Sequence, residues 1–129
     1  MNANQKGKRF ERDVAKQLNK KFDTNVRRTP MSGGMSIKGD IIDINPDSVL
    51  FDYHWECKNQ EKLNIWKALE QARSDKPMGK TPVVVFTKNF EKDYACLEFE
   101  DFMNLLLTIQ QLKDEIDSGI SVLQDRSLN

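Results

Sequence analysis

The sequence predicts an α/β fold in which a small mixed sheet lies between helices. Three patterns predict it: a four-residue apolar spacing near the amino terminus, strict alternation over residues 49–58, and a β-branched run at residues 83–86. The expected order of elements is helix, three strands, helix, two strands and helix. A chain of 129 residues is long enough for one domain with a core and too short for two ordinary ones.

The first third of the chain is expected to hold a helix, two strands and a loop. Apolar residues spaced by four predict a helix over about residues 5–22, and these are Phe10, Val14, Leu18 and Phe22. Residues 26–29 are predicted as a short strand, and residues 30–36, with a proline and two glycines, as a loop. Residues 39–44 are the next predicted strand.

Residues 49–58 form the clearest predicted strand. Apolar side chains occupy its odd positions and mostly polar ones its even positions, so one face of the strand is expected to be apolar. Cys57 lies on the apolar face and is expected in the core. His54, the only histidine, lies on the polar face and is expected to be partly exposed.

The second half is expected to hold two helices and two strands. Residues 63–76 are predicted as a helix whose apolar side comprises Ile65, Trp66, Ala68, Leu69 and Ala72. Residues 82–87 form a predicted strand that is buried on both faces, and residues 94–97 a further one. The last helix is predicted over residues 99–117, where Ser118-Gly119 is expected to stop it.

A single domain is expected over residues 1–117, followed by a carboxyl-terminal tail at residues 118–129 that is flexible or docked on a partner. No apolar run exceeds four residues, which excludes a membrane span, and the amino terminus lacks the apolar stretch of a secretory signal. Two cysteines suit a reducing compartment, so the protein is expected in the cytoplasm. The sequence Gly33-Gly34 lacks the lysine of a phosphate-binding loop, and no nucleotide cofactor is expected.

Charge is unevenly distributed although the net charge is zero. Residues 1–30 hold nine Lys or Arg against three Asp or Glu, and residues 91–129 hold three against nine. On the first predicted helix one face collects Lys8, Arg9, Arg12, Lys16 and Lys20. Such a basic end can bind a polyanion while the acidic end faces away, or it can simply keep a helix soluble.

Glu11 falls inside the apolar stripe of the first predicted helix. Because a bare buried carboxylate costs several kcal/mol, it must be paired, hydrogen-bonded or bound to a metal. Two interpretations stay open at this point: an ordinary ion pair with an arginine, or a place in a functional acidic cluster.

Asp40, Glu56 and Lys58 form the candidate catalytic group. If their strands are neighbours, the two carboxylates can approach each other and supply the hard oxygen ligands that Mg²⁺ prefers. Lys58 shares a strand face with Glu56 and can orient a water or offset charge on a phosphate. The trio fits metal-assisted phosphodiester hydrolysis, and the alternative is a solvated strand face with a Glu–Lys pair.

The order and spacing of these residues resemble the PD-(D/E)xK nuclease superfamily, most closely the small archaeal-type Holliday junction resolvases and their phage relatives. The matching segments are Lys8-Arg9-Phe10-Glu11, Arg27-Arg28, Ser32-Gly33-Gly34, Lys38-Gly39-Asp40 and Glu56-Cys57-Lys58. The likeness extends to about residue 112, and Gly39 stands where the superfamily has the proline of its name. It implies a restriction-endonuclease-like core, a mixed four- to five-stranded sheet flanked by helices.

The resemblance also implies residue roles. Mg²⁺, which Mn²⁺ could replace, would be held by Asp40, Glu56, the Cys57 backbone carbonyl and Glu11. The implied catalytic residues are Glu11, Asp40, Glu56, Lys58, Ser32 and Gln71. The implied DNA contacts are Lys8, Arg9, Arg12, Lys16, Arg27, Arg28, Ser32, Gly33, Gly34 and Lys38.

The implied activity is a Mg²⁺-dependent, structure-selective endonuclease that cuts branched DNA such as four-way junctions during recombination or repair. The alternatives are a nuclease of the same fold acting on nicked, flapped or duplex DNA, or a DNA-binding module that does not cut. Two symmetric cuts call for a two-fold homodimer. A broad apolar stripe on the last predicted helix offers a possible surface, and the alternative is that most of it packs on the protein's own sheet. Its members are Phe102, Leu105, Leu106, Ile109, Leu112 and Ile116.

Overall fold

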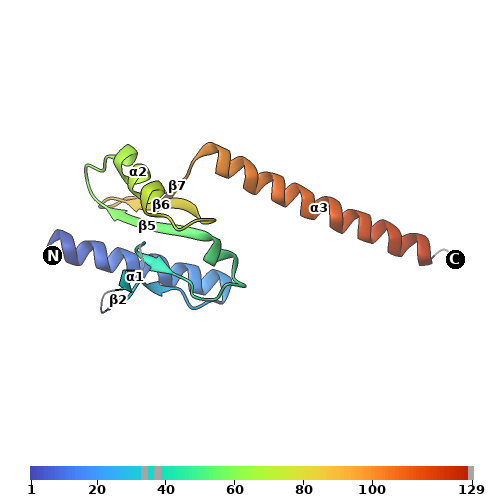
Figure 1. Cartoon of the computed structure of the whole chain (residues 1–129), viewed down its shortest axis with the longest axis horizontal. Helices are drawn as coiled ribbons and strands as arrows, with labels where there is room; N and C mark the ends of the chain where they lie inside the picture. The colour runs from blue at the N-terminus through green and yellow to red at the C-terminus, as the bar shows by residue number, and fades with distance from the viewer. Residues whose placement is uncertain (33–34, 37–38, 128–129) are drawn as a thin grey trace. The chain divides into compact units, whose positions relative to one another are not determined.

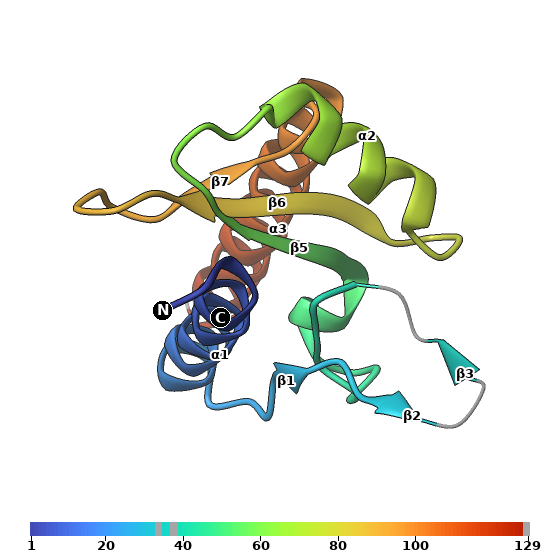
Figure 2. The same ribbon diagram turned by 90° about the vertical axis from the view of Figure 1, so that its left-hand side faces the viewer.

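The structure is a computed structural model that describes residues 1–32, 35–36 and 39–127. It divides the chain into two units, Met1–Leu97 and Glu98–Asn129. The first unit holds a sheet with one helix on each face, as Figures 1 and 2 show, and the second is one long helix. The residues predicted for the site all fall in the first unit.

The sheet in the described part of the chain has five strands in the order β1-β4-β5-β6-β7. Their bounds are Arg27–Arg28 for β1, Ile41–Ile42 for β4, Tyr53–Asn59 for β5, Thr81–Thr87 for β6 and Tyr94–Cys96 for β7. The central pair, β5 and β6, is parallel, and the other pairs are antiparallel. The mixed α/β class is therefore confirmed.

Helix α1 (Ala3–Phe22) begins at a capping box, in which the Asn2 side chain accepts a hydrogen bond from the Gln5 backbone N–H at 2.8 Å. It ends at Asp23, which is left-handed at φ 51°. The Asn19 side chain then holds both the N–H and the carbonyl of Val26, at 2.6 and 2.7 Å. This clamp turns the chain back along α1, so that β1 runs beside the helix that carries Glu11.

The two faces of the sheet have separate cores. The core on the α1 face is built by buried side chains of the helix, of three strands and of the segments before β1 and β5, namely Phe10, Val14, Ala15, Val26, Ile41, Leu50, Cys57 and Val85. Helix α2 (Ile65–Asp75) covers the other face, where Ala68 and Ala72 pack on Val84. Trp66 was expected on the buried side of α2, but it is 79% exposed. Helix packing on small alanines leaves it pointing to solvent.

Two segments differ from the sequence prediction. Residues 30–36, predicted as a loop, contain the two-residue strands β2 (Met31–Ser32) and β3 (Met35–Ser36), which pair across the Gly-Gly dipeptide of the sequence. Residues 49–52, predicted as strand, form a 3-10 turn, η1 (Val49–Asp52). The Ser48 hydroxyl accepts from the Leu50 N–H at 3.2 Å and starts this turn.

Helix α3 (Phe99–Ser127) is longer than predicted, because it continues through Ser118-Gly119 instead of stopping there. A glycine inside a helix costs about 1 kcal/mol but removes no backbone donor, so a single glycine destabilises a helix without ending it. Many of its large apolar side chains are exposed by 41–71%, among them Phe99, Phe102, Met103, Leu106, Ile109, Leu112 and Ile116. Within the described residues, no helix combines the length and apolar character that crossing a membrane requires.

Candidate active site

A cleft of about 770 Å³ opens between the first half of α1 and the carboxyl end of β5. It collects six of the predicted site residues, namely Lys8, Glu11, Arg28, Asp40, Cys57 and Lys58. These residues come from α1, β1, the start of β4 and β5, so only the tertiary fold brings them together. The cleft is the candidate active site.

Asp40 is fixed by three hydrogen bonds to backbone groups, two of them to β5 and one to the chain that leaves β1. Its N–H donates to the Trp55 carbonyl at 2.8 Å, and its carboxylate Oδ2 accepts from the Cys57 N–H at 2.7 Å. Its carbonyl accepts from the Thr29 N–H at 3.0 Å, which ties it to the chain leaving β1. The carboxylate is therefore held at one place at the edge of the cleft.

Gly39 makes this position of Asp40 possible. Its φ of 98° is in the left-handed region, and a Cβ there would lie 3.1 Å from His54 Cε1 and 3.4 Å from the Trp55 carbonyl oxygen. Proline fixes φ near −65°, so it cannot adopt this conformation. The departure from the superfamily's proline at this position thus has a structural cause.

Glu56 lies beneath the cleft rather than in its lining. It is 2% exposed, and its Oε1 lies 3.2 Å from His54 Nε2. The expectation that His54 is partly exposed was wrong, because the imidazole is 3% exposed and is paired with Glu56 under Gly39. The polar face of β5 is thus buried at His54 and Glu56, which contact each other, and only Lys58 of this face reaches the cleft.

The Asp40 carboxyl is electrostatically linked to two other acids. The pKa of Asp40 is raised to about 7, chiefly by burial. The hydrogen bond from the Cys57 N–H opposes this rise, and the neighbouring carboxyls of Glu56 and Glu11 add to it. Burial first, and then the charge of Asp40, raises the pKa of the Cys57 thiol well above its usual range, so the thiol stays neutral. A nearby cation would relieve the repulsion among these carboxylates.

Glu11 forms an ion pair with an arginine, which is one of the two interpretations that the sequence left open. Its Oε2 lies 2.7 Å from Arg28 Nε, and the two side chains are 16% and 34% exposed. Both residues line the cleft together with Asp40. The pair therefore sets the orientation of Arg28, a predicted DNA contact, at the cleft wall.

The remaining predicted residues are dispersed. Arg9, Arg12 and Lys16 are exposed along α1, Arg27 is exposed on β1, and Gln71 is exposed on α2, and none of the five lines the cleft. Ser32 lies in β2, and its side chain is outside the described part of the structure. Gly33, Gly34 and Lys38 lie outside the described residues.

Two cleft residues were not anticipated from the sequence. The Thr29 Oγ1 and Asn59 Oδ1 atoms are buried, and in the described structure neither has a hydrogen-bond partner. Both residues line the cleft, where their oxygens could accept from or coordinate a bound group. The sequence signal that could have indicated these two residues is that Thr29 directly follows Arg28 and Asn59 directly follows Lys58.

The carboxylates fit a hard divalent cation that keeps much of its water. No group of three or more His, Cys, Asp or Glu side chains in the described ranges is arranged to hold a metal ion. Mg²⁺ is usually bound by one or two carboxylates, with water and substrate phosphate completing its shell. Asp40 and Glu56 can supply this number, and the unpartnered oxygens of Thr29 and Asn59 lie in the same cleft.

The sequence profile of the family described as "Phage putative PDDEXK endonuclease" matches residues 2–121. The chain belongs to this family. The match covers both the cleft and most of α3, and it places the chain in the PD-(D/E)xK superfamily of nucleases. Searches of curated proteins and of solved structures found no match. Membership of the phage PDDEXK endonuclease family thus rests on the sequence profile, and the cleft is the candidate active site for an endonuclease reaction.

Proposed function

We propose that this protein is a Mg²⁺-dependent endonuclease that hydrolyses phosphodiester bonds in branched DNA, including four-way junctions. One observation carries the proposal: the Asp40 carboxylate, held by the Cys57 N–H at 2.7 Å, lies in one cleft with Glu11 and Lys58, and the buried Glu56 carboxyl is near enough to raise the pKa of Asp40. Membership of a phage endonuclease family supports the reaction class. The phage family and a DNA substrate together support action in the cytoplasm of a bacterial host.

Asp40 and Glu56 would hold the Mg²⁺, with the Cys57 carbonyl and Glu11 contributing directly or through water. When bound, such an ion polarises a phosphoryl oxygen and lowers the pKa of a coordinated water. Mn²⁺ satisfies the same oxygen donors and should substitute. The His54 contact keeps the Glu56 carboxylate in a fixed orientation toward Asp40.

Lys58 and Arg28, which both line the cleft, would act on the substrate there. The Lys58 ammonium can orient the attacking water and stabilise negative charge as it develops on the phosphate. Arg28 is held by Glu11 through Nε and is still about one-third exposed, which suits a contact to a phosphate oxygen. Both side chains therefore favour a phosphodiester in this cleft.

The basic face of α1 would bind the DNA backbone next to the cleft. Lys8 lines the cleft, while Arg9, Arg12 and Lys16 are exposed further along the helix. Phosphate contacts of this kind position the duplex without reading its sequence. This arrangement favours a substrate chosen by shape.

A two-fold homodimer through α3 would give the paired cuts that junction resolution requires. Isoleucines or other large apolar residues recur every seven positions at Phe102, Ile109, Ile116 and Leu123, with Leu105 and Leu112 three residues after the first two. Isoleucine and leucine in this order favour parallel two-stranded coiled coils. Several members of this stripe are exposed by 44–61%, among them Phe102, Ile109 and Ile116, so the stripe offers an apolar face to a second copy of the chain.

The deciding experiment is cleavage of four-way, flapped, nicked, duplex and single-stranded DNA in Mg²⁺. We expect Asp40→Asn, Glu56→Gln and Lys58→Ala each to lose at least about 100-fold in cleavage rate while still binding branched DNA. Glu70→Gln, an exposed carboxyl-to-amide change on α2, is the matched control and should cut normally.

The outcomes separate the possible functions. Unchanged cleavage by Asp40→Asn and Glu56→Gln would eliminate the proposed site. Cleavage of nicked, flapped or duplex DNA in preference to junctions would point to a nuclease of the same fold with another substrate. If the wild-type chain binds DNA without a metal and cuts none of the substrates, the protein is a DNA-binding module that does not cut.

A further inference from the structure

The connection between β6 and β7 presents a phenylalanine in an unusual backbone conformation. Phe90 has a φ of 63°, in the left-handed region, and its side chain is fully exposed. A bulky residue there costs about 1–2 kcal/mol, and an exposed ring gains nothing from burial. Backbone strain that the fold maintains without a packing gain is characteristic of functional positions.

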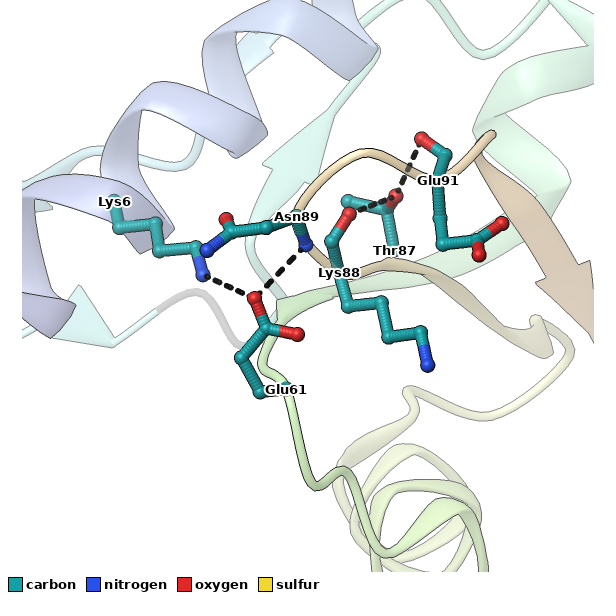
Figure 3. Close-up of polar contacts among 6 residues, drawn as sticks. All are labelled: Lys6, Glu61, Thr87, Lys88, Asn89 and Glu91. Atoms are coloured by element: carbon teal, nitrogen blue, oxygen red, sulfur yellow. Dashed lines mark hydrogen bonds and ion pairs between the residues drawn. The ribbon is translucent and has the colours of Figure 1, made fainter.

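The turn that carries Phe90 is braced from within (Figure 3). The Glu91 N–H donates to the Lys88 carbonyl at 3.2 Å, which closes a turn with Asn89 and Phe90 at its centre. The Thr87 hydroxyl lies within 2.9–3.3 Å of three carbonyls of the turn, those of Lys88, Glu91 and Lys92. The backbone at Phe90 is therefore held in place by its neighbours.

The same turn is attached to α1 on both of its sides. The Glu61 carboxylate accepts from the Asn89 N–H at 3.1 Å and lies 3.9 Å from Lys6 Nζ, as Figure 3 shows. On the other side, the Gln17 amide donates to the Asp93 carboxylate at 2.8 Å. The exposed ring is thus presented by a fixed support and not by a loose loop.

Phe90 lies next to the candidate active site. A second hollow, of about 530 Å³, is lined by Phe90, Lys88, Lys16 and Lys20, and Asn59 lines both this hollow and the catalytic cleft. Three acidic residues, Asp13, Glu91 and Asp93, also line the hollow and balance its three lysines. Charge alone therefore does not make it a phosphate site, and the aromatic ring is its distinguishing group.

We propose that Phe90 is a stacking platform for an unpaired or unstacked DNA base adjacent to the scissile phosphate. Resting on the proposed nuclease function, this inference names the feature of the substrate that the enzyme recognises: the exposed base face at a branch point. In continuous duplex every base is already stacked on its neighbours, so the ring has a partner only where stacking is interrupted. Trp66, the other strongly exposed aromatic of the first unit, lines neither hollow.

The test measures binding without cleavage, using the full-length chain with Asp40→Asn and a chelator present. Four-way DNA carries 2-aminopurine at a branch-point position, and a matched duplex carries it within a helix. The added variants are Phe90→Gly, which suits the positive φ and should fold at least as stably, Phe90→Leu, which keeps apolar volume without a ring, and Phe90→Trp. Met78→Ala, at another fully exposed apolar residue, is the matched control.

We expect Phe90→Gly and Phe90→Leu each to weaken junction binding roughly ten-fold and to abolish quenching of the branch-point 2-aminopurine. Phe90→Trp and Met78→Ala should bind and quench as the parent does, and duplex binding should change less than about two-fold in all variants. Equal losses on duplex and junction, full binding by Phe90→Leu, loss of dimerisation by Phe90→Gly, or no DNA binding by the parent would each overturn the proposal. Absence of Mg²⁺-dependent cleavage by the wild type would instead overturn the nuclease function and leave a Phe90-dependent junction-binding result standing.

Discussion

His54 and Glu56 occupy the buried face of β5, with His54 Nε2 and Glu56 Oε1 3.2 Å apart and both side chains at most 3% exposed. The Cα of Gly39 lies over the same imidazole. Gly39, which directly precedes Asp40, therefore lies against His54, and His54 in turn contacts Glu56, whose carboxyl raises the pKa of Asp40. The geometry of the two candidate metal ligands therefore depends on a histidine that contacts neither the cleft nor solvent.

Removal of the His54 imidazole should destabilise the fold. His54→Ala leaves the Glu56 carboxylate buried without that partner, and we expect a loss of about 1–3 kcal/mol in the free energy of unfolding. Urea denaturation followed by circular dichroism measures it. His54→Gln keeps a donor and should lose less, whereas equal losses for both variants would show that the contact with Glu56 is not what stabilises this site.

Substitution of Gly39 should be costlier than substitution of another glycine with the same backbone conformation. Gly39→Ala and Gly79→Ala both place alanine at positive φ, but only at position 39 would the Cβ meet other atoms, at 3.1 Å from His54. We expect about 1 kcal/mol of destabilisation for Gly79→Ala and at least about 1 kcal/mol more for Gly39→Ala, measured by thermal or urea unfolding. Identical losses would contradict the crowding at His54.

The stability of the metal-free protein should fall as pH rises between about 4 and 7. Since the pKa of Asp40 is raised to about 7 from an ordinary 3.8, the folded chain keeps a proton that the unfolded chain has released in this interval. The stabilising contribution is complete below pH 4 and lost above pH 7. The urea midpoints of unfolding at pH 5 and pH 8, in the presence of a chelator, measure this loss. The difference between the two midpoints should be smaller for Asp40→Asn than for the wild type. Equal differences for the two proteins would refute the raised pKa of Asp40.

Charge on the stripe of α3 should dissociate the proposed dimer. Ile109→Asp with Ile116→Asp puts two carboxylates into the expected interface, where each costs several kcal/mol. Analytical ultracentrifugation should find the wild type as a dimer and the double variant as a monomer at the same micromolar concentration. Gln111→Asp, on a different side of the helix, should stay dimeric. A monomeric wild type would contradict the dimer.

Loss of two arginines from α1 should weaken DNA binding and reduce its salt dependence. Arg9→Ala with Arg12→Ala removes two proposed phosphate contacts, so the slope of log affinity against log salt should fall by about two. Fluorescence anisotropy across a salt series measures it. Lys62→Ala with Lys67→Ala, both exposed near or on α2, is the matched control. An unaltered slope would indicate that the basic face of α1 does not contact phosphates and only keeps the helix soluble.

Local patterns were sufficient for the element order and not for its details. The four-residue spacing of α1 and the β-branched run of β6 predicted their elements because these patterns reflect burial along a regular helix or strand. The Ser48 cap made residues 49–52 a 3-10 turn despite their alternation, and α3 passed Gly119 because one glycine costs less than a continuing helix gains. His54 was misjudged since polarity does not reveal which face of β5 a helix covers.

The sequence by itself determined the α/β class, the family and the segments that carry Asp40, Glu56 and Lys58, because periodicity and motif spacing are properties of the chain. Only the tertiary structure decided that Glu11 pairs with Arg28, that Glu56 is held by His54, and that Gly39 cannot be proline. It also decided that Phe90 stands beside the cleft. These relationships join residues far apart in sequence, or depend on backbone angles and burial that only the folded chain fixes.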